Sequence, residues 1–147
     1  MKEKIMTTQN YTNHRRLVPM YHYVGGVLLL AIFIGSIVNF VNSAPENKYS
    51  AALIVASTVL LGIVAAFTRL FALKAQDRAI RAEENLRHYV LTGKLLNRQL
   101  RLSQIIALRF ASDDEFPALA EKAVAEKMKA NDIKKAIINW RADYNRV

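Results

Sequence analysis

The sequence predicts an all-α membrane protein, in which a two-helix transmembrane hairpin has a second helix that extends into the cytoplasm and carries a small helical C-terminal cap. Three observations predict this fold class. Residues 17–68 form two apolar segments whose only charges, Glu46 and Lys48, lie between them. From Arg69 to Leu91, helix-forming residues continue without Gly or Pro. The remaining chain has apolar stripes at helical spacing and no sustained alternation typical of strands.

The first apolar segment predicts a membrane span over about residues 21–42. Residues 1–20 are expected to form a cytoplasmic tail and a segment that enters the membrane, with Pro19 at the start of the helix and Tyr21 and Tyr23 at the interface. A cleaved signal peptide is the alternative. Its apolar core would have about 7–15 residues, and this one is longer, which favours a retained span.

The second apolar segment, residues 49–68, carries no charge until Arg69. Twenty helical residues extend about 30 Å, which is the thickness of the hydrocarbon core. Residues 69–92 are expected to continue the same helix as a cytoplasmic extension. Gly93 follows Thr92 in the position that ends helices.

The turn between the spans is too short for a separate domain, so the spans are expected to form a tight antiparallel hairpin. Each span has small or polar residues four apart, a spacing that lets helix backbones approach in lipid. These transmembrane packing residues are Ala31, Gly35 and Asn39 in the first span and Thr58, Gly62 and Ala66 in the second. Packing within the hairpin is favoured over homo-oligomerisation through these faces. Neither span contains an ionisable residue, which argues against a transporter.

The basic residues predict the orientation of the chain. Of the 21 Lys and Arg residues, four precede residue 17, one lies in the turn, and 16 follow residue 68. The positive-inside rule then places both termini in the cytoplasm. Four basic residues near the membrane boundary are expected to contact anionic lipid headgroups: Arg15, Arg16, Arg69 and Lys74.

The extension carries a row of mostly small apolar residues at alternating spacings of three and four. We call this row the seam; it comprises Ala72, Ala75, Ala79, Ala82, Leu86 and Tyr89. Other faces carry the charge pairs Asp77–Arg81 and Glu83–Arg87 at helical spacing. The seam is expected to be covered by the chain's own C-terminal helices, by a second copy or by another protein, and the first is slightly favoured.

Residues 93–147 predict a helical cap of about three helices. The first covers about residues 102–110, with Ser103 as a candidate cap. The second follows a candidate capping box at residues 112–115. The third begins near Asn131 or Asp132, and its apolar stripe comprises Ile133, Ala136, Ile137, Trp140 and Tyr144.

The residues that carry catalytic chemistry are sparse. The chain contains no Cys, which excludes a thiol nucleophile or a thiolate metal site. His14, His22 and His88 are expected at the membrane interface or on the surface, too far apart for one metal site. Helix capping explains the carboxylates of residues 113–115, and Glu83 and Glu84 are expected on a solvated face. We expect no cofactor, no metal and no enzymatic activity.

Nucleic acid is disfavoured as a partner. The part of the chain from residue 69 onward has 16 basic and 10 acidic residues, a balance of only +6, and the two signs are interleaved. The stretch with Lys94, Arg98 and Arg101 has no aromatic residues between the charges for base stacking.

Three stretches resemble one family of small bacterial membrane proteins. These are residues 69–89, residues 105–113 and residues 133–143, and residues 9–16 are similar to the family's usual beginning. The family is catalogued as a domain of unknown function. The resemblance implies an inner-membrane protein with two spans and supplies no activity, substrate or cofactor.

These observations predict a non-enzymatic accessory or scaffold protein that mediates protein–protein interaction at the cytoplasmic face of the inner membrane. It is expected to act as a homo-oligomer or as a subunit of a larger membrane complex. The alternative is a homo-oligomeric channel built from two-span hairpins, which the short outer turn and the lack of a polar pore face weigh against.

Overall fold

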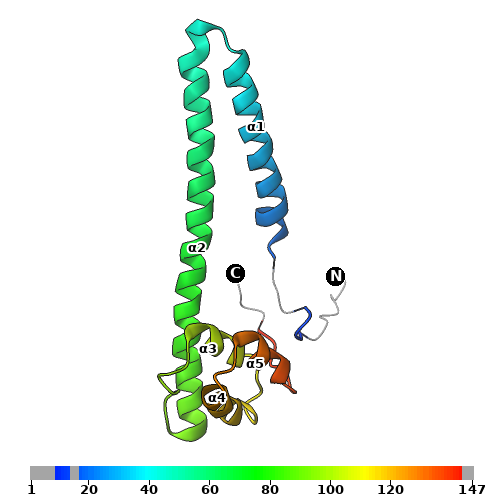
Figure 1. Ribbon diagram of the computed structural model, residues 1–147, viewed down its shortest axis with the longest axis vertical. Coiled ribbons are helices and arrows are strands. Elements are labelled where there is room, and N and C mark those ends of the chain that lie inside the picture. The colour runs from blue at the N-terminus through cyan, green and yellow to red at the C-terminus, as the bar shows by residue number, and fades with distance from the viewer. Residues whose placement is uncertain (1–8, 14–16, 144–147) are drawn as a thin grey trace, which may run out of the picture. The chain divides into compact units, whose positions relative to one another are not determined.

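The computed structural model describes residues 9–13 and 17–143. The chain divides into two compact units: Leu17–Leu73 forms the first, and Lys74–Val147 forms the second together with Met1–Arg16. Figure 1 shows the order of the helices along the chain. One helix, α2 (Lys48–Thr92), contributes residues to both units. The described residues form an all-α fold, as the sequence predicts.

The first unit contains the helical hairpin. It begins with one π-helical segment, η1 (Met20–Gly25), which continues into α1 (Gly26–Asn42). After a 3₁₀ turn, η2 (Pro45–Asn47), the chain enters α2. The predicted single helix from residue 49 to about 91 is therefore confirmed, with 45 residues. The two helical stretches Met20–Asn42 and Pro45–Thr92 are long and apolar enough to cross a membrane.

The turn of the hairpin is stabilised by its only basic residue. Lys48 Nζ donates to the carbonyl oxygens of Phe40 at 2.7 Å and Val41 at 3.1 Å. These carbonyls belong to the last turn of α1, where a helix leaves acceptors without backbone partners. The ammonium group thus satisfies them and carries a charge of the sign that a helix C-terminus favours.

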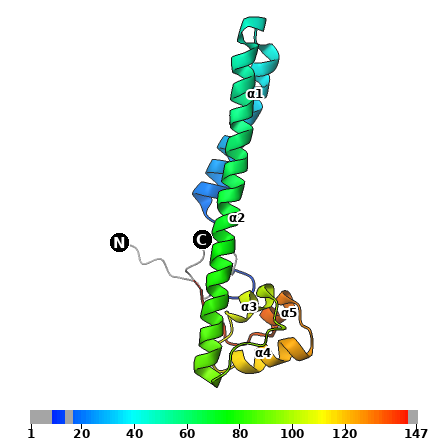
Figure 2. The ribbon, with the colours of Figure 1, turned by 90° about the vertical axis from the view of Figure 1, so that its left-hand side faces the viewer.

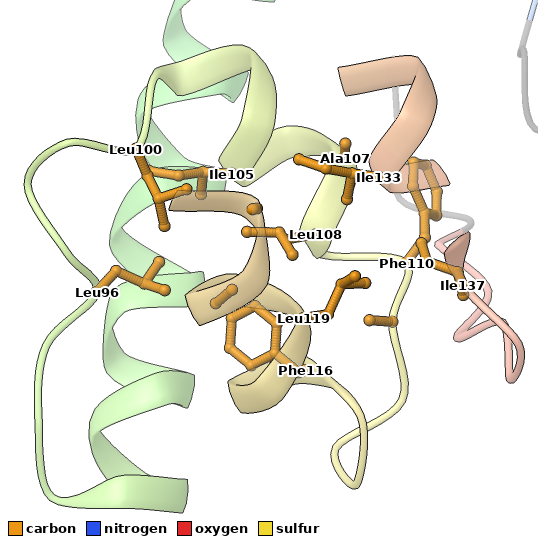
Figure 3. Close-up of a cluster of buried hydrophobic side chains, with 13 residues drawn as sticks. Leu96, Leu100, Ile105, Ala107, Leu108, Phe110, Phe116, Leu119, Ile133 and Ile137 are labelled. Carbon is orange, nitrogen blue, oxygen red and sulfur yellow. The ribbon is translucent and has the colours of Figure 1, made fainter. Parts of the chain in front are cut away.

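The second unit packs three short helices beside the C-terminal part of α2 (Figure 2). They are α3 (Leu102–Leu108), α4 (Phe116–Ala125) and α5 (Ala130–Ala136). Gly93 ends α2 as predicted, with a φ of 73° that a residue bearing Cβ rarely adopts. The cluster of buried apolar side chains comprises Leu96, Leu100, Ile105, Ala107, Leu108, Phe110, Ala111, Phe116, Leu119, Ala120, Ala123, Ile133 and Ile137 (Figure 3).

The end of the chain differs from the prediction of one long final helix. Helix α5 stops at Ala136, and Trp140 instead forms an antiparallel bridge with Ala111. The backbone N–H of Arg141 donates to Phe110 at 2.7 Å, and that of Ser112 donates to Asn139 at 3.1 Å. Tertiary pairing therefore overrides the helical apolar pattern. The last residue of the predicted stripe, Tyr144, lies outside the described residues.

The starts of the cap helices also depart from the predicted caps. Ser103 lies inside α3, and the backbone N–H of Arg101 is held by the Gln104 side chain at 2.7 Å. Helix α4 begins at Phe116, so Pro117 lies in the first turn, where no hydrogen bond is lost.

Candidate functional site

The α2 extension, which we define as residues 74–92 of α2, has one packed face. Ile80, Glu84 and His88 are buried there, at successive spacings of four residues that place them on one side of a helix. The side chains that cover this face come from the cap of the same chain. His88 packs edge-on against Phe116, with ring centroids 5.7 Å apart. The cap therefore closes onto its own α2 extension.

Arg87 joins the α2 extension to the loop before α4. Its guanidinium group lies 3.0 Å from the Glu84 carboxylate and 2.6 Å from that of Asp113. It also donates to the carbonyl oxygen of Ala111 at 2.7 Å and lies over the Phe116 ring. The predicted pair of Arg87 with Glu83 is replaced by these contacts. A planar group with several donors suits such simultaneous contacts, because one cation can serve several acceptors.

Glu84 is a buried carboxylate, contrary to the expectation of a solvated face. Only 6% of the residue is exposed. Burial raises the pKa of the Glu84 carboxyl above its ordinary value of 4.5, while the hydrogen bond and charge of Arg87 act in the opposite direction. The ion pair with Arg87 explains how this carboxylate is accommodated inside the cap.

His88 likewise belongs to the interior rather than to the surface. Its Nδ1 lies 2.7 Å from the carbonyl oxygen of Lys94 and 3.2 Å from the Thr92 hydroxyl. This network ties the last turn of α2 to the chain that leaves it. The histidine therefore has a structural role at the end of the helix.

A pocket of about 380 Å³ opens beside the packed face. Its lining is mostly polar and charged and consists of Gln76, Ala79, Ile80, Glu83, Glu84, Arg109, Arg141, Ala142 and Asp143. Arg109, which is 5% exposed, pairs with Asp143 at 3.2 Å and lies over the Phe110 ring. Among the described residues that line this pocket there is no Ser, Thr, Cys or His. Across residues 9–13 and 17–143, no group of three His, Asp or Glu side chains is placed to hold a metal ion.

Most of the seam lies on the side of the α2 extension away from the cap, while Ala79 also lines the pocket described above. Ala75, Ala79, Ala82, Leu86 and Tyr89 are exposed and Ala72 is half-buried. Leu86 and Tyr89 are 63% and 53% exposed. The favoured expectation that the C-terminal helices cover the seam is wrong, because those helices pack on the face of Ile80, Glu84 and His88. The seam is the candidate functional site.

The two predicted packing faces of the hairpin have different surroundings. On α2, Thr58 is 4% exposed, and a Cβ added at Gly62 would meet Leu29 of α1 at 3.7 Å. Ala66 lines an apolar groove with residues of α1. On α1, the face formed by Ala31, Gly35 and Asn39 is exposed. Its neighbour Ser36 is buried instead, and this hydroxyl donates to the carbonyl oxygen of Phe33. Of the predicted packing residues, Thr58 is thus buried and Gly62 lies close to α1, while Ala66 and the predicted residues of α1 are exposed, and their role in helix packing stays a prediction.

The predicted lipid-contacting residues are only partly described. Arg69 is half-buried and Lys74 is exposed. Arg15 and Arg16 lie outside the described residues, as does His14.

The sequence pattern alone missed the polar contacts that organise the cap. Arg87 and Asp113 are 26 residues apart, and nothing in the spacing of charges singles out that pair. A detectable signal was the i, i+4, i+8 spacing of Ile80, Glu84 and His88, but a carboxylate and an imidazole at two of the three positions concealed a buried face.

Comparison with known proteins identifies the family of this chain. The curated proteins and the solved structures contain no match to this chain. A family of unknown function, DUF6526, matches residues 6–147, which is nearly the whole sequence. The chain therefore belongs to the DUF6526 family.

Proposed function

We propose that this protein is a non-enzymatic accessory or scaffold protein of the bacterial inner membrane. The hairpin anchors it, both termini lie in the cytoplasm, and the seam of the α2 extension binds a protein partner. One observation carries the proposal: the cap covers one face of the α2 extension and leaves the seam exposed on the other.

Helical geometry places the seam opposite the cap. Each residue turns the helix by about 100°, so Ala82, two residues from both Ile80 and Glu84, lies about 160° around the helix from each of them. A row of exposed apolar side chains at heptad spacing is the usual surface of a helix that packs against another helix. Leu86 and Tyr89 supply most of the apolar area that a partner would remove from water.

The proposed orientation rests on the distribution of charge. The 16 basic residues after residue 68 and the four before residue 17 favour a cytoplasmic location, while the turn carries only Lys48. Arg69 and Lys74, together with Arg15 and Arg16, would then meet anionic headgroups at the cytoplasmic surface. This attraction is electrostatic and weakens in high salt.

The test introduces charge into the seam. The double variant Ala79→Glu/Ala82→Glu and the wild-type protein are purified from native membranes in mild detergent, and the mass and composition of each assembly are measured. The variant is expected to lose its partner, because burying two carboxylates between helices is strongly unfavourable.

A matched control separates loss of binding from loss of folding. Ala118→Glu/Ala125→Glu adds the same charge at exposed positions of α4 and is expected to retain the assembly. Urea unfolding of the cap, followed by fluorescence of the only Trp, must remain unchanged in both variants. An Ala79→Glu/Ala82→Glu protein that keeps the same assembly as wild type disproves the function of the seam.

A further inference from the structure

We infer that the partner of the seam is a second copy of this chain, whose α2 extension lies parallel and in register with the first. This inference rests on the proposed function above, because it requires the seam to be an interface. It adds the identity of the partner, the direction of the two helices and the residues that pair between them.

Membrane insertion fixes the relative direction of two copies. Chains anchored by the same hairpin have the same orientation and depth, so their α2 extensions run parallel with equal residues at equal height. In such a pair the seam of one copy faces the same seam of the other copy. Ala72, Ala79 and Leu86 occupy one core position of the heptad, and Ala75, Ala82 and Tyr89 occupy the other. The alanines allow the two helices to approach closely, and the larger residues, Leu86 and Tyr89, lie at the end of the seam away from the membrane.

The charges beside the seam are complementary for this arrangement. Arg78 and Glu83 are both exposed and lie on opposite flanks of the seam. They are five residues apart, the separation at which flanking residues of two parallel, in-register helices meet across a coiled coil. Arg78 of each copy would therefore face Glu83 of the other, giving two attractive pairs. The next flanking pair, Asn85 and Val90, is uncharged and introduces no repulsion.

The cap packs mainly on the side of the α2 extension away from the seam, although its residues 141–143 line a pocket together with Ala79 and Glu83. The side chains that the cap buries, Ile80 and Glu84, occupy the outer positions of the same heptad. Confinement of both copies to one membrane also raises their effective concentration, which favours association through a seam made largely of Ala.

Cysteine cross-linking tests the arrangement directly, because the natural chain has no Cys. Full-length Ala82→Cys protein in native membranes is oxidised, and disulfide-linked dimer is measured on a non-reducing gel. Two Cys residues at equal core positions lie within disulfide reach. Arg81→Cys, also exposed but turned about 100° away, is the matched control. We expect at least about tenfold more dimer from Ala82→Cys. Equal yields, or no dimer from Ala82→Cys, overturn the inference.

Charge reversal tests the register and the identity of the partner. In the Ala82→Cys background, Arg78→Glu or Glu83→Arg alone places like charges opposite each other and is expected to weaken association by about tenfold. The double reversal Arg78→Glu/Glu83→Arg restores opposite charges and the dimer yield. Only a self-pairing seam predicts this rescue, so a double variant as weak as the single variants contradicts the inference.

A photo-crosslinker attached to Ala82→Cys distinguishes failure of this inference from failure of the proposed function. A product with the mass of two copies supports self-pairing. A product with a different protein, and none with a second copy, overturns self-pairing while the proposed function stands. Absence of any protein adduct overturns both.

Discussion

At the scale of single residues, the cap depends on one cation placed between two carboxylates. The side chains of Arg87 and Glu84 are 10% and 8% exposed, while that of Asp113 is 62% exposed. A buried ion pair of this kind contributes little net stability compared with apolar packing, but removing one partner leaves an isolated buried charge. The consequence of substitution therefore depends on which member is removed.

Arg87→Ala is expected to destabilise the cap by about 3 kcal/mol at neutral pH, because Glu84 then remains buried without its cation. Urea unfolding followed by Trp140 fluorescence measures the change. Asp113→Ala is the control, since its largely exposed carboxylate leaves no buried charge behind, and a change below about 1 kcal/mol is expected. Equal losses for the two variants would show that Arg87 does not compensate Glu84.

The raised pKa of Glu84 predicts how stability changes with pH. The folded cap holds the Glu84 proton more tightly than the unfolded chain does, so ionisation disfavours the folded state. The stabilising contribution is complete below the ordinary pKa of 4.5 and is lost as pH rises through the raised pKa of the folded state. The difference in unfolding free energy between wild type and Glu84→Gln should therefore fall as pH increases from about 4 to 7. Parallel pH profiles for the two proteins would contradict this assignment.

At the scale of elements, one carboxylate fixes the extended segment after α5. Glu115 accepts hydrogen bonds from the backbone N–H groups of Ser112, Ile138 and Asn139, at 3.2–3.3 Å. These bonds hold residues 137–143 against residues 110–112, and Trp140 then packs on Phe110 with ring centroids 5.0 Å apart. Glu115, which the sequence predicts as part of a helix-capping box, thus joins two segments that are distant in sequence.

Glu115→Ala is expected to release this segment while α3 and α4 persist. The backbone N–H groups of Ile138 and Asn139 lose their acceptor, while that of Ser112 keeps its bond to Asn139, and the loss costs about 1–3 kcal/mol locally. Hydrogen exchange of the Ile138 and Asn139 amides should accelerate by about tenfold or more, with little change for the amides of α4. Glu126→Ala, at an exposed position, is the matched control and should leave both rates unchanged.

The same elements show what a single sequence can predict. The end of α1 and both limits of α2 follow from apolar length, Pro45 and Gly93, and the structure confirms them within about two residues, whereas the first residues of the predicted first span form η1. The end of α5 does not follow, because Ile137 and Trp140 continue a helical stripe and only the pairing with residues 110–112 makes the segment extended. The spacing of the seam residues is visible in the sequence, and their role as an interface stays a prediction. The packed face of Ile80, Glu84 and His88 was not predictable, since its contacts depend on Asp113 and Phe116, which the fold brings from outside α2.

At the scale of the whole molecule, the proposed topology makes a direct prediction about chemical accessibility. Glu46→Cys in the turn should react with a membrane-impermeant maleimide added outside intact cells. Glu126→Cys, exposed in the cap, should react only after the membrane is opened. Because the natural chain has no Cys, the unsubstituted protein gives the background signal. The opposite pattern of labelling would invert the topology.

The pairing of residues 110–112 with residues 137–143 also affects the order of events during synthesis. Both apolar helices leave the ribosome before residues 137–143, and domains fold in the order in which their parts appear. In the proposed topology, the hairpin can therefore be inserted into the membrane while the cap is incomplete. Residues 110–112 stay unpaired until residues 137–143 have been synthesised, so the cap closes only after that point.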